Sequence, residues 1–143
     1  MNKELKVTQE LLINADISKV WDAIVNPEIV KQYFFGTQVE SEWKEGSPIV
    51  FSGEFDGKQY RDKGTILAID PKKFLQYSYW SGFSGLEDKA ENYSLVTYEL
   101  ETVDSAVKLT MTQEGFANEQ GHQHAVQGWE MVLNGLKNIV EKE

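Results

Sequence analysis

Two histidines near the C-terminus are the residues whose type and spacing most directly suggest chemistry. His122 and His124 stand one residue apart, and a pair of imidazoles can bind a transition metal. They fall where a helix is predicted to begin, and side chains at i and i+2 of a helix point about 200° apart. The pair therefore cannot converge on one ion, and the chain has no cysteine to complete a site. We expect both histidines to be exposed and to bind no metal.

Three glutamates, Glu10, Glu91 and Glu114, could act as general bases if they lined a pocket. Because carboxylates in strands usually face water, we expect them on the surface. Ser81 and Ser84 lie in a glycine-containing stretch, but no histidine is near them in the sequence to activate them. The chain also has no phosphate-binding loop, nucleophile elbow, zinc-protease motif or dinucleotide-binding motif. The sequence thus predicts no catalytic residue and no cofactor, and it favours a binding protein over an enzyme.

Aromatic side chains are the stronger candidates, because Phe, Tyr and Trp make up 12% of the chain. Alternation along the predicted strands places a row of apolar residues on the inner face of a sheet. Gln113 falls in such a row, so its amide needs a partner, which would be a tyrosine, a water or a ligand. These residues either pack as a plain core or line a cavity for a ligand. The candidate ligand-binding residues are Tyr77, Tyr79, Tyr98, Leu109, Met111, Gln113 and Trp129.

The elements that would position these residues begin with a strand and two short helices. The alternating segment Leu5–Asn14 predicts the strand. Ile17–Val25 has helical apolar spacing, and Asp16 precedes it as a cap. Asn26-Pro27 is a second helix start, and the helix that follows is predicted to end before Gly36.

The rest of the chain is predicted to be an antiparallel meander followed by one long helix. From about Glu119 the apolar period changes to 3.6 residues, and the stripe is long enough for about five helical turns. Such a helix must lie on an apolar surface, and the sheet is the large candidate. The chain is thus predicted to be an α+β fold with a single domain over residues 1–143. The predicted strands are 39–43, 49–55, 59–69, 74–80, 93–102 and 107–113, with a long irregular segment over 81–92.

This order of elements resembles the SRPBCC, or START-like, helix-grip superfamily. That superfamily includes START lipid-transfer domains, polyketide cyclases and Bet v-like plant allergens. The branch that the chain most resembles is the C-terminal domain of the activator of the heat-shock chaperone ATPase. The matching segments are Lys19–Ile24 with Asn26-Pro27-Glu28, Tyr33-Phe34, Gly64–Pro71, Leu75–Trp80, Val96–Glu101, Leu109–Phe116, and Gly128-Trp129 with Leu133 and Leu136.

The resemblance implies a sheet of about six to seven strands curved around the C-terminal helix, with a cavity between them. It also implies a function: binding of a small hydrophobic or aromatic molecule of lipid, flavonoid or polyketide type. A cyclase or aromatase that acts on such a molecule is one alternative. The other is a co-chaperone that binds a chaperone or another protein. The eukaryotic activator has a further N-terminal domain for chaperone binding, and few residues precede the first strand here, so we favour ligand binding.

The charge of the chain excludes some classes of partner. With 14 Lys and Arg against 23 Asp and Glu, the net charge is -9, and the basic residues are scattered. A nucleic-acid-binding protein needs a concentrated basic surface, so we expect no nucleic-acid partner. No apolar run is long enough for a membrane span, and the N-terminus lacks the apolar centre of a signal peptide. We expect a cytoplasmic protein.

Overall fold

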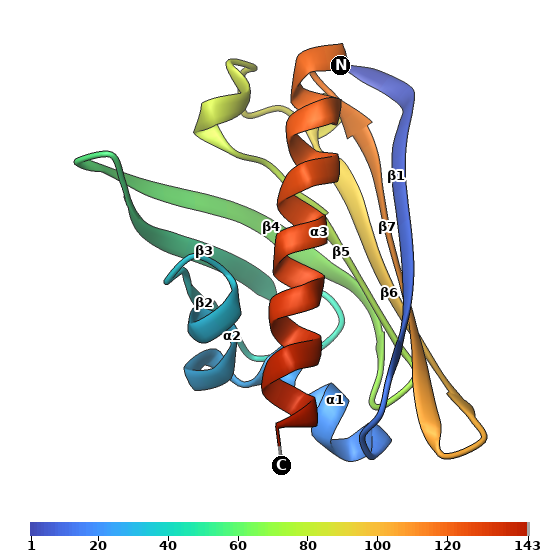
Figure 1. The fold of residues 1–143 in the computed structure, drawn as a ribbon. Helices are drawn as coiled ribbons and strands as arrows, with labels where there is room; N and C mark the ends of the chain where they lie inside the picture. Colours follow the sequence, from blue (N-terminus) through green and yellow to red (C-terminus); the bar gives the residue numbers. More distant parts are fainter. Residues whose placement is uncertain (143) are drawn as a thin grey trace.

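The computed structural model describes residues 1–142 and shows a curved seven-stranded antiparallel sheet that holds one long helix against its concave face (Figure 1). The strand order is β1-β7-β6-β5-β4-β3-β2, so β1 and β2 are the edges. This arrangement confirms the predicted α+β helix-grip fold. The strands are β1 Asn2–Ile13, β2 Gln38–Ser41, β3 Pro48–Phe55, β4 Lys58–Asp70, β5 Phe74–Tyr79, β6 Ser94–Val103 and β7 Ala106–Phe116.

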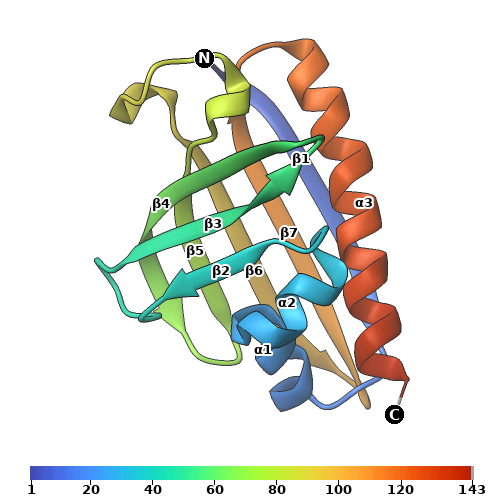
Figure 2. The same ribbon diagram turned by 90° about the vertical axis from the view of Figure 1, so that its left-hand side faces the viewer.

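Two short helices, α1 (Ile17–Val25) and α2 (Pro27–Tyr33), follow β1 as predicted. The Asp16 carboxylate accepts a hydrogen bond from the backbone N–H of Ser18 at 2.9 Å and so caps α1. Asn26 ends α1 and caps α2, because its side chain accepts from the backbone N–H of Glu28. Figure 2 shows the two helices at one end of the sheet, beside β2 and the C-terminal half of the long helix.

The long helix α3 (Glu119–Glu141) supplies the apolar stripe that the sequence predicted. The helix runs along the concave side of the sheet (Figures 1 and 2), and its buried side chains belong to the hydrophobic core. They are Trp129, Val132, Leu133, Leu136 and Val140. None of the helices among the described residues is long and apolar enough to cross a membrane.

The segment predicted to be irregular, 81–92, contains two short 3-10 turns, η1 (Gly82–Ser84) and η2 (Ala90–Asn92). The sequence predicted a strand over 74–80, but β5 ends at Tyr79. Trp80 instead forms an isolated bridge with Lys63. Its indole Nε1 donates to the backbone oxygen of Leu86 at 3.2 Å, which ties the 81–92 segment to the sheet.

Candidate functional site

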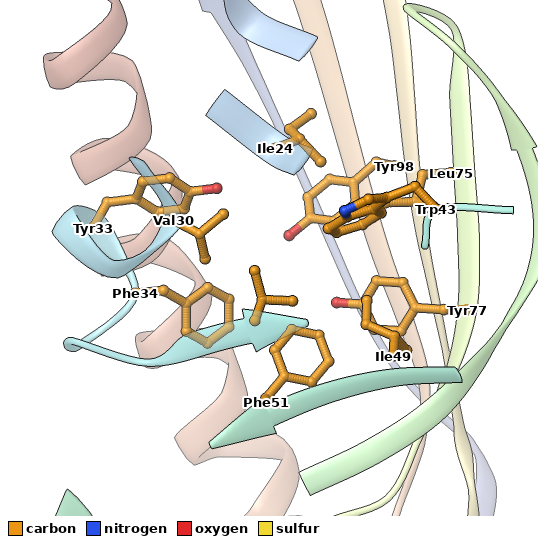
Figure 3. A pocket seen from close by; sticks show the side chains of 11 residues that line it. Ile24, Val30, Tyr33, Phe34, Trp43, Ile49, Phe51, Leu75, Tyr77 and Tyr98 are labelled. Atoms are coloured by element: carbon orange, nitrogen blue, oxygen red, sulfur yellow. The ribbon is translucent and has the colours of Figure 1, made fainter. Parts of the chain in front are cut away.

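A small cavity lies between α1, α2 and the concave face of strands β2, β3, β5 and β6 (Figure 3). Its volume is about 20 Å³, which is room for about one water molecule. Pockets for drug-sized ligands are about 300–1,000 Å³, so this cavity is far smaller than the roomy interior that the aromatic content suggested. The lining residues are Ile24, Val30, Tyr33, Phe34, Val39, Trp43, Ile49, Phe51, Leu75, Tyr77 and Tyr98.

The reason for the small volume is that aromatic rings from different elements pack against one another. Phe34, just after α2, stacks on Phe51 of β3 with ring centroids 6.1 Å apart. The same ring meets Trp129 of α3 edge-on at 5.9 Å. Phe51 in turn contacts Tyr77 at 5.6 Å, and Tyr98 contacts Trp129 at 6.0 Å. These edge-on and offset contacts stabilise the filled state and join three walls of the cavity.

Three phenol groups point into this apolar space (Figure 3): that of Tyr33 from α2, and those of Tyr77 and Tyr98 from the neighbouring strands β5 and β6. The hydroxyl of Tyr33 donates to the backbone oxygen of Ala23 at 2.7 Å. Burial raises the pKa of all three tyrosines above the usual value of 10.0, and the proximity of Tyr98 adds to this for Tyr33 and Tyr77. The phenols therefore stay neutral and offer hydrogen bonds without charge.

Of the candidate residues taken from the sequence, Tyr77 and Tyr98 line the cavity. Trp129 adjoins them through its ring contact with Tyr98. Gln113 is buried, and its Oε1 accepts from the indole Nε1 of Trp129 at 2.7 Å. The Gln113 partner is thus a tryptophan, not the tyrosine, water or ligand that we expected. Alternation identified the buried amide correctly, but it could not show which residue of α3 lies opposite.

The other three candidates lie outside the cavity lining. Leu109 and Met111 are fully buried in the core beneath α3. Tyr79 is half-buried on the same face of β5 as Tyr77, and its hydroxyl donates to Oδ2 of Asp62 at 2.5 Å. The structure therefore divides the predicted row into a part at the cavity and a part that packs as core.

Several cavity residues were missed by sequence reasoning. Phe34 and Tyr33 were noticed only for the family resemblance, and no face was assigned to Trp43. Trp43 has a φ of 56°, a left-handed conformation just beyond β2, so strand alternation does not apply to it. Phe51 could have been found, because it alternates with Ile49 along β3 and both are buried.

A buried carboxyl was also missed. Asp62 of β4 is only 7% exposed. Burial raises its pKa above the usual 3.8, while the hydrogen bond from Tyr79 and, to a smaller extent, the nearby Ser81 hydroxyl act in the opposite direction. Alternation from the buried Ile66 places position 62 on the inner face. That signal was present in the sequence.

The other titratable candidates do not form a site. His124 is exposed, as expected, but His122 is half-buried, which corrects the prediction: its Nε2 lies 2.8 Å from the backbone oxygen of Lys6, and its ring meets Phe116 edge-on. Glu10 and Glu91 are exposed and Glu114 is half-buried, and none lines the cavity. Among the described residues, no group of His, Asp and Glu is placed to hold a metal ion.

Comparisons with known proteins agree with the fold. A model of the protein family described as Activator of Hsp90 ATPase homolog 1-like protein matches residues 14–141. No curated protein matches the chain. The solution structure of ChR145 from Cytophaga hutchinsonii is 45% identical, with a TM-score of 0.83 over 99% of this chain and 97% of that one.

Two more distant structures share the fold. The Aha1 dimer from Colwellia psychrerythraea is 16% identical, with a TM-score of 0.75 over 95% of this chain and 96% of that one. DynU16, a protein of the dynemicin biosynthetic locus, is 17% identical, with a TM-score of 0.78 over 96% of this chain and 47% of that one.

Proposed function

The chain belongs to the family of Activator of Hsp90 ATPase homolog 1-like proteins, and on this fold we propose that it binds a small hydrophobic or aromatic molecule between the sheet and α3. The observation that carries the proposal is the convergence of three neutral phenol groups inside an apolar cavity (Figure 3). Apolar walls with a few polar groups that fix orientation are the usual composition of a small-molecule site. The ligand would be of lipid, flavonoid or polyketide type.

Ligand entry requires the cavity to enlarge, and α2 is the wall best suited to move. It has seven residues, too few for a stable helix without tertiary contacts. The segment after it carries Phe34, which lines the cavity, and Phe35, which is exposed and has a φ of 56°. A left-handed conformation at a phenylalanine is strained, so a rearrangement there releases strain. The ligand then selects an open state in which Phe34 has left Phe51 and Trp129.

Affinity would come mainly from apolar area removed from water, roughly 25 cal/mol per Å². The hydroxyls of Tyr77 and Tyr98 would contribute orientation. Part of this free energy is spent in separating the Phe34, Phe51 and Trp129 rings, because the aromatic contacts that close the cavity must be lost first. The filled cavity therefore favours ligands with aromatic rings, which can replace those contacts.

The test is an amide chemical-shift titration of the wild-type protein with a panel of fatty acids, flavonoids and aromatic polyketides. At least one class should give saturable shifts centred on Phe34, Val39, Tyr77 and Tyr98. Val39→Phe places a larger side chain in the cavity and should weaken binding about tenfold or more. Val103→Phe, at the exposed end of β6, is the control and should not weaken binding. Absence of saturable shifts with every class in the wild-type protein would overturn the proposal.

The nearly filled interior favours a second candidate function, a protein interaction made by the surface. Two large apolar residues are exposed: Phe35, just after α2, and Met131, on α3. This function predicts that the chain changes the ATPase rate of a purified heat-shock chaperone and that Phe35→Ser with Met131→Ser removes the effect. An unchanged ATPase rate would exclude this interaction.

A further inference from the structure

Asp62 lies on the concave face of the sheet at the border of the aromatic cluster. It is paired in register with Phe51 of the neighbouring strand. The Phe51 ring lies 5.7 Å from Tyr79 and 5.6 Å from Tyr77, and both Phe51 and Tyr77 line the cavity. The carboxyl is therefore about one side chain away from the lining of the cavity.

The two oxygens of this carboxyl have different surroundings. Oδ2 accepts a hydrogen bond from the Tyr79 hydroxyl at 2.5 Å. Oδ1 is completely buried and has no hydrogen-bond partner among the described residues. No described lysine or arginine compensates the charge either. An unpaired buried acceptor destabilises a fold, and more so where it is charged, so a donor placed at this oxygen would remove that cost.

Other inward-facing polar groups near the cavity already have partners. Tyr33 donates to Ala23, Gln113 accepts from Trp129, and the hydroxyl of Tyr60 is 2.6 Å from that of Thr37. The second unpartnered buried side-chain atom in the described chain is Nδ1 of His122, which belongs to a ring packed on Phe116 beside β1. Asp62 Oδ1 is thus a buried carboxylate oxygen beside the aromatic cluster that has no partner among the described residues.

We propose that Oδ1 of Asp62 anchors a hydrogen-bond donor of the bound molecule, and that Tyr79 is the positioning residue that holds the carboxyl. This inference rests on the proposed ligand binding and narrows its chemistry. The ligand is an aromatic molecule that carries a donor group, either a hydroxyl or a protonated amine. A hydrogen bond to a charged acceptor contributes about 1.5–3 kcal/mol, which corresponds to a tenfold or larger preference over the same ring without a donor.

The environment of the carboxyl supports this assignment. Burial raises the pKa of Asp62, so the ionised form is poorly solvated when Tyr79 and Ser81 are its nearest polar neighbours. A donor placed on Oδ1 supplies the missing solvation. A purely structural role, in which Asp62 only fixes the Tyr79 ring, uses Oδ2 and leaves Oδ1 unexplained.

The experiment compares three naphthalene probes on the full chain by amide-shift titration. 2-Naphthol carries a neutral donor, 2-(aminomethyl)naphthalene carries a cationic donor, and 2-methoxynaphthalene carries none. We expect at least one donor probe to bind the wild-type protein about tenfold more tightly than the methoxy probe. Which donor probe binds more tightly then identifies the hydroxyl or the ammonium as the preferred group.

Variants locate the preference. Asp62→Leu, which has no acceptor, should bring the donor and methoxy probes to similar affinities, and Asp62→Asn, which keeps only a neutral acceptor, should reduce the preference. Tyr79→Phe should reduce the preference while leaving the affinity for the methoxy probe unchanged. The matched control is Asp56→Asn, which removes the same charge from the exposed turn of the same hairpin and should keep the full preference.

The outcomes separate the two proposals. If all three probes bind with equal affinity, and Asp62→Asn changes none of them, the anchor is wrong and ligand binding stands. If a preference exists but survives in both Asp62 variants, the donor is bound elsewhere and the anchor is again wrong. If no probe gives saturable shifts, the anchor is overturned together with the binding of aromatic molecules.

Discussion

At the scale of single residues, several polar side chains are buried in the interior of this protein, and each of those near the cavity except Asp62 has a hydrogen-bond partner for its buried polar atom. Gln113 and Trp129 satisfy each other, and Tyr33 is satisfied by the backbone of α1. Asp62 is the exception on the concave face, with one bonded oxygen and one free oxygen. Asp62 makes the stability of the protein depend on pH, and the paired groups make it sensitive to substitutions that remove one partner.

Asp62 predicts a specific pH dependence of stability. Its native pKa is raised above the usual 3.8, so the native state binds the proton more tightly than the unfolded chain. Between those two pKa values the native state holds more protons, and the free energy of unfolding therefore falls as the pH rises. Urea denaturation at several pH values should show wild type losing stability relative to Asp62→Asn across this window. Parallel pH profiles for the two proteins would show that the native pKa is not raised.

The pair formed by Gln113 and Trp129 predicts a cost when one member is removed. Gln113→Leu leaves the buried indole N–H without an acceptor, which should lower the free energy of unfolding by about 1–3 kcal/mol. Gln127→Leu, on the exposed side of α3, is the matched control and should change it by less than about 0.5 kcal/mol. Equal midpoints in urea for the two variants would mean that the hydrogen bond contributes nothing.

At the scale of elements, two glycines have contrasting surroundings: Gly64 lies against a neighbouring strand, and Gly128 faces open space. A Cβ on Gly64 would lie 1.6 Å from the backbone oxygen of Ser78, where β4 and β5 approach each other. Gly64→Ala should therefore force the strands apart and cost more than about 3 kcal/mol. A Cβ on Gly128 of α3 would meet nothing within 4 Å, so Gly128→Ala should stabilise the helix by about 0.5–1 kcal/mol. Thermal melts of both variants should shift in opposite directions, and a shift in the same direction would contradict this account.

The elements were largely predictable because their signals are local. The caps at Asp16 and Asn26 and the Asp56-Gly57 turn depend on a few neighbouring residues, and they lie where the sequence placed them. Trp80 and Trp43 were not predictable, because a bridge to Lys63 and a left-handed backbone depend on contacts with other strands. Local patterns also cannot give the register that places Asp62 against Tyr79.

At the scale of the whole molecule, the order of elements predicted the grip of the sheet on the helix, but not the volume left between them. That volume depends on how rings from α2, β3, β5, β6 and α3 interlock, and Phe34 contributes to three of those contacts. Counting aromatic residues cannot distinguish rings that line a space from rings that fill it. In this chain the rings fill most of the space, so a ligand can bind only if the cavity first enlarges.

The same architecture makes α3 indispensable for cooperative folding. Truncation after Ala125 removes Trp129, Val132, Leu133, Leu136 and Val140, all buried against the sheet. Each contributes about 1.5–3 kcal/mol by burial, and together they match the ~5–15 kcal/mol by which whole domains are stable. The truncated chain should lose its sharp thermal transition by circular dichroism, because the concave face of the sheet is then exposed to water. Met131→Gln, on the exposed side of α3, is the control and should melt as sharply as wild type. A truncated chain that still unfolds in one steep step near the wild-type temperature would show that the sheet folds without the helix it holds.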